Sequence, residues 1–145
     1  MEQQHQIHTI SPVYNEHSRI LILGSFPSVK SREAGFFYGH PQNRFWPLVT
    51  MLLGYAEVPL DYADKKQMLL DNRIALWDVL GYCEREGSLD SDITCEQPND
   101  LAGFLQNHQQ IHTICCNGGK AAAAFKKYTR QLDLQAVSYT HLTLP

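Results

Sequence analysis

Residues 20–23 are an uninterrupted run of isoleucine and leucine that ends at Gly24, and this feature constrains the fold more than any other. Strands of a parallel sheet are buried on both faces, so they read as continuous apolar runs rather than as alternating ones. The run leads into the turn Gly24-Ser25-Phe26-Pro27-Ser28. In open α/β sheets, such turns at the carboxyl ends of strands line the ligand crevice. The sequence therefore predicts a buried parallel strand over residues 19–23 with a binding crevice beyond its end.

Further segments show the periodicity of strands and helices in alternation. The predicted strands cover residues 19–23, 74–78, 111–116 and 134–137. The predicted helices cover residues 44–53, 61–72, 101–105 and 120–128, and the charged stretch 84–100 is expected to be a long surface loop. Alternating strands and helices with right-handed crossovers give an α/β fold, in which helices cover both faces of one short four-stranded parallel sheet.

The size and charge of the chain limit its organisation and its partners. A chain of 145 residues with 43% hydrophobic content can bury a single core, so one domain is expected. The formal net charge of -3 excludes a generally basic surface, so a nucleic acid would be met by a local basic patch. The polar N-terminus shows no signal-peptide pattern, and no apolar run approaches membrane-spanning length. We expect a soluble, cytoplasmic protein of a prokaryote.

The cysteines and histidines do not form a metal-binding pattern. None of Cys83, Cys95, Cys115 and Cys116 belongs to a C-x-x-C pair, and the seven histidines are scattered without the spacing of metal ligands. We therefore expect buried free thiols, no metal and no cofactor.

A second turn follows another predicted strand and lies at the same edge of the sheet. Asn117-Gly118-Gly119 comes directly after the strand over residues 111–116, just as Gly24-Ser25-Phe26-Pro27 follows the first strand. Because the carboxyl ends of parallel strands meet at one edge, the two turns are expected to line one crevice.

Three motifs resemble the uracil-DNA glycosylase superfamily, and most closely its hypoxanthine-DNA (deoxyinosine) glycosylase branch. They are Leu23-Gly24-Ser25-Phe26-Pro27-Ser28, Gly39-His40-Pro41-Gln42-Asn43-Arg44-Phe45-Trp46 and Cys116-Asn117-Gly118. The resemblance implies a three-layer α/β/α fold without a metal. It also implies that the protein hydrolyses the N-glycosidic bond of a deaminated base, hypoxanthine or uracil, flipped out of DNA in base excision repair. The motifs contain no lysine, which argues against a lyase that forms a Schiff base and favours a monofunctional glycosylase.

The chain departs from the family's pattern at two places. In classical uracil enzymes the first turn carries an Asp that activates water, and in mismatch enzymes an Asn, whereas this turn offers Ser25, Phe26 and Ser28. The family also ends in a Pro/Ser-rich phosphate-gripping loop and a final helix, where this chain has residues 138–145. These eight residues resemble a non-native tail, so we expect an incomplete glycosylase-like domain over residues 1–137. The alternative function is a catalytically incompetent domain that binds DNA or a base.

Two asparagines are the candidate catalytic residues that the resemblance implies. Asn43 precedes a predicted helix, where its amide can position water or hold the base; from spacing alone it is equally well the N-cap of that helix. Asn117 can present a donor and an acceptor to the edge of a flipped base, although Asn-Gly is also a common turn dipeptide.

Further residues around these motifs are candidates for binding the substrate. They are Gly24, Ser25, Phe26, Pro27, Ser28, Phe36, Tyr38, Gly39, His40, Arg44 and Gly118. The first turn can offer backbone N–H groups, and one ring of the aromatic loop is expected to stack on a base while the others are core. His40 can donate a hydrogen bond or simply constrain the loop, and Arg44 can hold a phosphate or pair with Asp78. Lys30, Arg32 and Lys120 supply the local basic rim, and the expected partner of the monomeric chain is DNA with a deaminated base.

A flavodoxin-like enzyme acting on a small molecule is a third interpretation of the same fold class. Neither glycine-containing turn matches a dinucleotide or P-loop fingerprint, so the sequence disfavours it.

Overall fold

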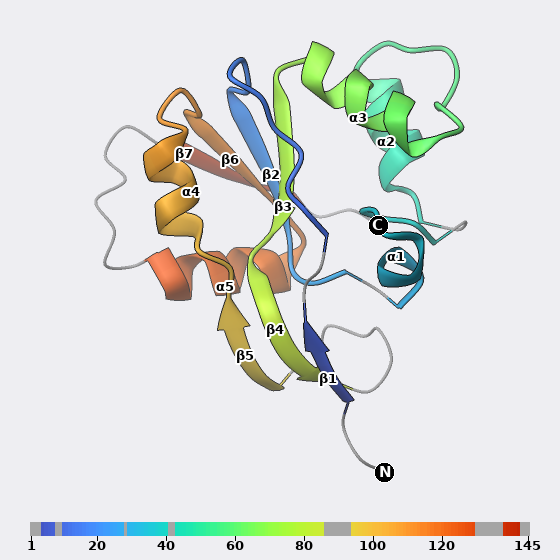
Figure 1. Ribbon diagram of the computed structural model, residues 1–145. Coiled ribbons are helices and arrows are strands. Elements are labelled where there is room, and N and C mark those ends of the chain that lie inside the picture. Colours follow the sequence, from blue (N-terminus) through green and yellow to red (C-terminus); the bar gives the residue numbers. More distant parts are fainter. Residues whose placement is uncertain are drawn as a thin grey trace.

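A four-stranded parallel sheet forms the centre of the protein (Figure 1). The computed structural model describes residues 4–7, 10–27, 29–40, 43–85, 94–129 and 138–142. The strands follow the order β3-β2-β6-β7, and every neighbouring pair is parallel. Their bounds are β2 (Ile20–Gly24), β3 (Ile74–Asp78), β6 (Thr113–Asn117) and β7 (Ser138–Leu142). The predicted four-stranded parallel sheet is confirmed.

The central strands are buried because apolar side chains face helices on both sides. Leu21 and Leu23 point to one face and Ile22 to the other, and all three are buried. The predicted strand over residues 74–78 matches β3. The candidate strand over residues 134–137 lies outside the described residues, and the described fourth strand, β7, falls within the expected tail instead.

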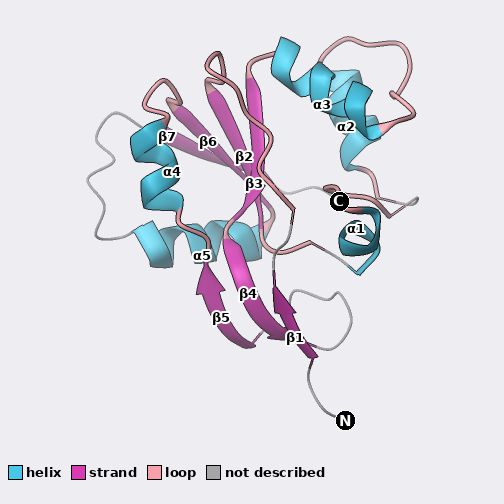
Figure 2. Ribbon diagram, viewed as in Figure 1, coloured by secondary structure: helices cyan, strands magenta, loops and turns pink. Residues whose placement is uncertain are grey.

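Helices α2 (Phe45–Leu52) and α3 (Tyr62–Asp71) cover one face of the sheet (Figure 2). Their apolar cluster with the sheet includes Trp46, Val49 and Leu69. The Asp61 carboxylate accepts a hydrogen bond from the Asp64 backbone N–H, so it caps α3 as its residue type predicts. The short helix α1 (Val29–Ala34) precedes α2 and was not predicted.

Helices α4 (Leu101–Asn107) and α5 (Gly119–Thr129) cover the opposite face. Leu101 and Leu105 of α4, with Ala121 and Phe125 of α5, pack against the sheet in a second apolar cluster. Alanines at this contact bring α5 close to the strands. The two faces together give the three-layer α/β/α arrangement that the family resemblance implied.

A second, antiparallel sheet corrects the expectation of a loop over residues 84–100. It consists of β1 (Gln4–Ile7), β4 (Leu80–Arg85) and β5 (Thr94–Pro98), in the order β1-β4-β5. Two of these strands lie at edges, where polar residues and Pro98 are tolerated, so their sequences lack the apolar pattern of the central strands.

One asparagine fixes the junction between the two sheets. Strand β4 continues from β3 after a single residue, Val79. The Asn99 side-chain amide donates to the carbonyl oxygens of Asp78 at 2.9 Å and Leu80 at 3.2 Å. These bonds hold the chain just beyond Asp78, at the carboxyl end of β3.

No helix among the described residues is long and apolar enough to cross a membrane.

Candidate active site

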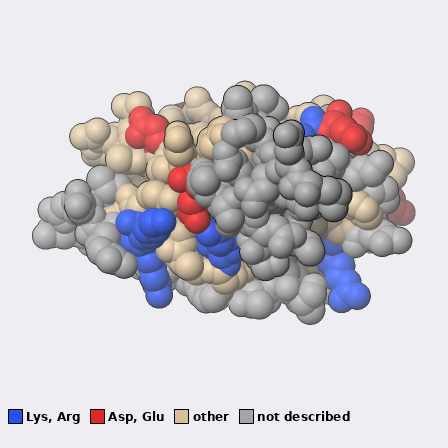
Figure 3. All heavy atoms as spheres, turned by 90° about the horizontal axis from the view of Figure 1, so that it is seen from below, with Lys and Arg blue, Asp and Glu red and all other residues tan. Residues whose placement is uncertain are grey.

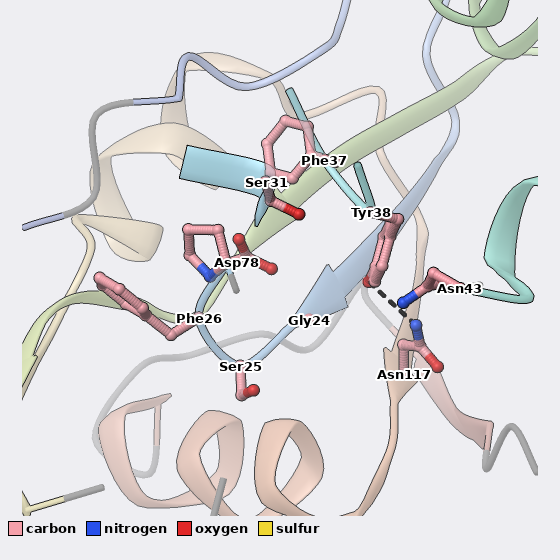
Figure 4. Close-up of a pocket in the computed structure, with 10 residues that line it drawn as sticks. Gly24, Ser25, Phe26, Ser31, Phe37, Tyr38, Asn43, Asp78 and Asn117 are labelled. Atoms are coloured by element: carbon pink, nitrogen blue, oxygen red, sulfur yellow. Dashed lines mark hydrogen bonds between the residues drawn. The ribbon is translucent and has the colours of Figure 1, made fainter. Parts of the chain in front are cut away.

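A pocket of about 190 Å³ opens at the carboxyl ends of β2, β3 and β6 (Figure 4). The predicted crevice is therefore present, and both special turns contribute to it. The lining residues are Gly24, Ser25, Phe26, Pro27, Ser31, Phe37, Tyr38, Asn43, Asp78 and Asn117.

Gly24 allows two polar side chains to approach the floor of the pocket. A Cβ atom at this position would clash with the Asp78 carboxylate and would lie 2.8 Å from the Tyr38 hydroxyl oxygen. The turn itself is held by backbone hydrogen bonds from Val79 N–H to the Gly24 carbonyl and from Leu80 N–H to the Ser25 carbonyl. The glycine is thus required by close packing, not by a positive φ angle.

Tyr38 enters the pocket from the aromatic loop through an unusual backbone conformation. Its φ angle is 53°, in the left-handed region that bulky residues rarely adopt. The buried Ser31 hydroxyl accepts a hydrogen bond from the neighbouring Gly39 N–H at 2.9 Å. The Tyr38 ring stacks on Phe45, with centroids 3.9 Å apart and planes 16° apart. This packing against Phe45 directs the Tyr38 hydroxyl toward Asn117.

Asn117 ends β6 and reaches the pocket from the opposite side. It is half-buried, and its Nδ2 donates a hydrogen bond to the Tyr38 hydroxyl at 2.9 Å. The following Gly118 adopts a φ of 100°, which turns the chain into α5. The turn interpretation of Asn-Gly is therefore correct, and the amide also lies in the pocket, as the site interpretation requires.

Asn43 is not the N-cap residue of α2, which is Arg44, but its side chain still contacts the start of that helix. Its Oδ1 accepts a hydrogen bond from the Phe45 backbone N–H at 2.8 Å, at the start of α2. Figure 4 shows its Nδ2 directed toward the Tyr38 hydroxyl and Asn117. Because the oxygen is used by the helix, the amide presents its N–H donors to the pocket.

Asp78 lines the pocket although it was considered only as a partner for Arg44. It is the last residue of β3, and only 3% of its surface is exposed. Its position follows from the rule that placed Gly24 and Asn117, because β3 pairs with β2 in parallel and Asp78 lies opposite Gly24. A carboxylate at the end of a buried parallel strand was the signal that would have identified it.

The remaining candidates lie around the pocket or outside the described residues. Phe36 is buried and stacks on Trp46, with centroids 5.7 Å apart, and it does not line the pocket. Arg44 is exposed at the N-cap position of α2, and no ion pair among the described residues joins it to Asp78. Gly39 and Gly118 each follow a lining residue in the chain and His40 follows Gly39, but none of the three lines the pocket. Ser28 lies outside the described residues.

The basic residues near the site differ in their surroundings. The Lys120 ammonium group pairs with Glu96 at 2.5 Å, so its charge is compensated within the protein. The Arg32 guanidinium lies 5.9 Å from the ring centroid of Phe26, which lines the pocket, and the Lys30 side chain lies outside the described part.

In the coloured part of the face in Figure 3, Lys and Arg form separate groups, with acidic side chains between and beyond them. No continuous basic surface appears there.

Glu96 and Tyr128 join β5 to α5 beside this lysine. Burial opposes ionisation of Glu96, but hydrogen bonds from Lys120 and Tyr128, with the charges of Lys120 and Lys127, hold the Glu96 pKa below its ordinary value. Burial and the hydrogen bond to Glu96 raise the pKa of Tyr128 to about 12. The Tyr128 hydroxyl therefore stays protonated and donates to Glu96 over the physiological pH range.

The described cysteines are free, as predicted. Cys83 and Cys116 are buried and Cys115 is half-buried, while the side chain of Cys95 lies outside the described part. Burial and the neighbouring Cys115 raise the pKa of Cys116 to about 11. Within the described ranges of the chain, no three His, Cys, Asp or Glu side chains group closely enough to hold a metal ion.

Comparisons with known proteins match both the sequence and the fold. The uracil DNA glycosylase superfamily model matches residues 11–144. A hypoxanthine DNA glycosylase of Methanosarcina acetivorans is 43% identical over 109 residues, which are 75% of this chain and 69% of the relative. The hypoxanthine DNA glycosylase of Methanosarcina barkeri is 34% identical over 110 residues, which are 76% of this chain and 70% of the relative.

A solved structure is similar over nearly the whole chain. The NMR structure of a candidate uracil DNA glycosylase from Methanosarcina acetivorans has a TM-score of 0.81 and 35% sequence identity. The match covers 97% of this chain and 84% of the other.

Proposed function

Because the chain belongs to the uracil DNA glycosylase superfamily, we propose that it removes hypoxanthine from DNA by hydrolysing the N-glycosidic bond. The observation that carries this proposal is a pocket in which two asparagine side chains and a tyrosine hydroxyl converge at the carboxyl edge of the sheet. The two hypoxanthine DNA glycosylases that resemble the chain support this base as the substrate.

The reaction needs stabilisation of charge on both sides of the breaking bond. As the bond from sugar to base lengthens, positive charge develops on the sugar and negative charge on the base. A water molecule adds its oxygen to the sugar C1′ and loses one proton, while the base leaves with the bonding electrons and gains one proton, so the net reaction consumes one water. Preorganised N–H donors around the base lower the energy of this charge separation.

We assign the donors to the two asparagines. One Nδ2 hydrogen of Asn117 is used by the Tyr38 hydroxyl, which leaves the second to meet the base. Asn43 has its oxygen fixed by the Phe45 N–H, so its amide hydrogens can position the water or hold the base. Ser25 and the backbone of the first turn complete the wall of the pocket.

The proposed substrate is a nucleotide flipped out of DNA, and the proposed acting form of the chain is the monomer. A base inside a duplex cannot reach a recessed pocket, so it must leave the stack. Uracil carries the same keto and ring N–H groups as hypoxanthine, so we include it as a second substrate.

The test uses a labelled duplex with one deoxyinosine, followed by hot alkali to cleave abasic sites. The protein should produce strand cleavage at the inosine, and Asn43→Ala and Asn117→Ala should each reduce the single-turnover rate by about 10²–10³-fold, as losing one transition-state donor does. A folded wild-type chain that binds this duplex without cleaving it would contradict the proposal and identify an incompetent binding domain.

Asp61→Ala is the matched control for this test. It removes the side-chain cap of α3, whereas Asn43→Ala removes the hydrogen bond that the Asn43 side chain accepts from the Phe45 N–H at the start of α2. Asp61 is exposed and does not line the pocket, so the control should lose stability but keep its rate.

A further inference from the structure

We infer that Glu96 is a positioning residue for catalysis, which holds the start of helix α5, and thereby Asn117, in place from the second sheet. This inference rests on the proposed function, in which Asn117 is one of the two candidate catalytic residues. Glu96 lies in β5 and does not line the pocket, so it acts through the turn that joins Asn117 to α5.

The Glu96 carboxylate binds two side chains of α5 at once. Its Oε1 accepts a hydrogen bond from the Lys120 ammonium group at 2.5 Å, and its Oε2 accepts one from the Tyr128 hydroxyl at 3.0 Å. The Lys120 and Glu96 side chains are only 27% and 15% exposed, so water and salt screen this ion pair less than an exposed one. Lys120 is the second residue of α5 and Tyr128 the tenth, so the contacts span about two turns of the helix.

The charge of Lys120 indicates that this contact serves the tertiary structure rather than the helix itself. Lys120 lies in the first turn of α5, which contains no acidic residue. The N-terminal end of a helix carries a partial positive charge, so a cation there is unfavourable. The Glu96 carboxylate compensates for this cation from a different strand. The start of α5 is therefore held by β5 as well as by its own sequence.

A short connection transmits the position of the helix to Asn117. Only Gly118 and one further glycine separate Asn117 from Lys120. The Ala122 N–H donates to the Gly118 carbonyl at 3.1 Å, so Gly118 is already bonded to the first turn of α5. A displacement of this turn therefore moves the Asn117 main chain, and with it the amide that donates to the Tyr38 hydroxyl.

The end of β5 is fixed to another wall of the pocket, so the strand can serve as a support. Asn99, three residues after Glu96, donates from its backbone N–H to the Val79 carbonyl at 2.7 Å. Its side chain donates to the carbonyls of Asp78 and Leu80. Asp78 ends β3, and β3 and β6 lie on either side of β2. The segment from Glu96 to Asn99 thus connects the ends of two strands that line the pocket, and Figure 1 shows β5 reaching up to α5.

A double-mutant cycle between Glu96 and Asn117 tests this role on inosine-containing DNA. Saturating single-turnover rates and half-saturating protein concentrations are measured for wild type, Glu96→Ala, Asn117→Ala and the double variant. A misplacement of about 1 Å costs about 10²-fold in rate, and losing one support of a packed helix should displace Asn117 by less, so Glu96→Ala should lower the rate by about 3–10-fold. The half-saturating concentration should not change.

The double variant distinguishes positioning of Asn117 from a general effect on the pocket. Once Asn117 is alanine, Glu96→Ala should cause no further loss of rate, because the side chain that it positions is gone. Losses that multiply in the double variant would overturn the inference. A wild-type rate in the single variant Glu96→Ala would overturn it as well.

Two further variants separate positioning from loss of stability. Asp100→Ala removes the cap of α4, in which the Asp100 carboxylate accepts the Gly103 N–H at 2.9 Å. Asp100 is exposed and does not line the pocket, so this variant should lose stability but keep its rate. An equal loss of rate in Asp100→Ala would overturn the inference. Glu96→Gln keeps a neutral acceptor, so it should lower the rate by a smaller factor, and it replaces Glu96→Ala in the cycle if that variant does not fold.

NMR of the Asn117 side-chain amide tests its placement without catalysis. The two N–H signals report the hydrogen bond to the Tyr38 hydroxyl. Glu96→Ala should shift these signals, whereas Asp100→Ala should not, and unchanged signals in Glu96→Ala would overturn the inference. If wild type releases no hypoxanthine from DNA, the proposed function fails and the NMR comparison alone decides whether Glu96 positions Asn117. If wild type releases hypoxanthine and the Glu96 variants react at the same rate, only the role of Glu96 fails.

Discussion

The Asn117 side-chain amide donates a 2.9 Å hydrogen bond to the hydroxyl of Tyr38, which lies 79 residues earlier in the chain. This bond joins the end of β6 to the aromatic loop within the pocket. It also fixes which way the Asn117 amide faces, because the tyrosine ring is held by its stack on Phe45. The orientation of one candidate catalytic residue therefore depends on a loop far away in sequence.

Replacing Tyr38 by phenylalanine should weaken catalysis without disturbing the fold. The phenyl ring keeps its stack on Phe45, but the Asn117 amide loses the acceptor that orients it. We expect kcat to fall by about 3–10-fold, the value of one net hydrogen bond, with little change in KM. Single-turnover rates on an inosine-containing duplex measure this effect.

Tyr55→Phe is the matched control for that substitution. The Tyr55 hydroxyl also accepts a hydrogen bond from an asparagine amide, that of Asn72 at 3.0 Å, but outside the pocket. Its kcat should equal that of wild type. Equal losses in the two variants would show that Tyr38 has no role specific to the site.

The two roles of Asn43 can be separated by a single-atom change. In Asn43→Asp the carboxylate still accepts the Phe45 N–H, but the pocket loses its amide donors. The free energy of unfolding should therefore stay within about 0.5 kcal/mol of wild type, whereas Asn43→Ala should lose about 1 kcal/mol, the net value of one hydrogen bond. Both variants should lose activity by about 10²–10³-fold. Denaturant titrations and single-turnover rates together test this separation, and an active Asn43→Asp would show that holding the Phe45 N–H is the whole role of this residue.

Gly24→Ala should destroy the pocket floor. The added methyl group would be forced against the Asp78 carboxylate and the Tyr38 hydroxyl, so a loss of about 1–3 kcal/mol in unfolding free energy is expected together with loss of activity. Gly119→Ala provides the comparison, because a Cβ atom at that position would meet nothing within 4 Å. Gly119→Ala should be as stable as wild type; a Gly24→Ala variant with wild-type activity would contradict the described geometry.

Much of the fold follows from the sequence because its central elements are encoded locally. The strand over residues 74–78 is a short apolar run after Arg73, and helix α3 has an aspartate cap with helical spacing. Residues 4–7 and 94–98 carry no comparable signal, because edge strands are partly solvated and their pairing depends on contacts distant in sequence. The loop expected over residues 84–100 was wrong for this reason.

The sequence predicts the pocket residues that lie at the ends of parallel strands. It does not predict how a loop brings Tyr38 into the pocket. Gly24 and Asn117 lie at strand ends, and the strand-end rule places both in one crevice. The same rule would have placed Asp78 there, but its carboxylate was interpreted as a partner of Arg44. The position of Tyr38 depends on a left-handed backbone and on the Phe45 stack, neither of which the sequence pattern encodes.

The contact of Glu96 with Lys120 and Tyr128 should make the free energy of unfolding depend on pH in the acidic range. Because the folded-state pKa of Glu96 lies below its ordinary value of 4.5, its contribution is present above that value and is lost as the pH falls through the folded pKa. Glu96→Gln should be less stable than wild type near neutral pH, and the difference should shrink as the pH falls below 4.5 and then through the folded-state pKa. Urea titrations over this range measure it, and a difference that does not change with pH would exclude the ionised contact as its source.

The most direct measurement of the central claim is identification of the product released from inosine-containing DNA. We would incubate the wild-type chain with the duplex, separate small molecules from DNA and identify them by mass spectrometry. Free hypoxanthine in amounts equal to the abasic sites formed is the predicted result. Intact DNA with no free base, from protein shown to be folded and bound to the duplex, would contradict it.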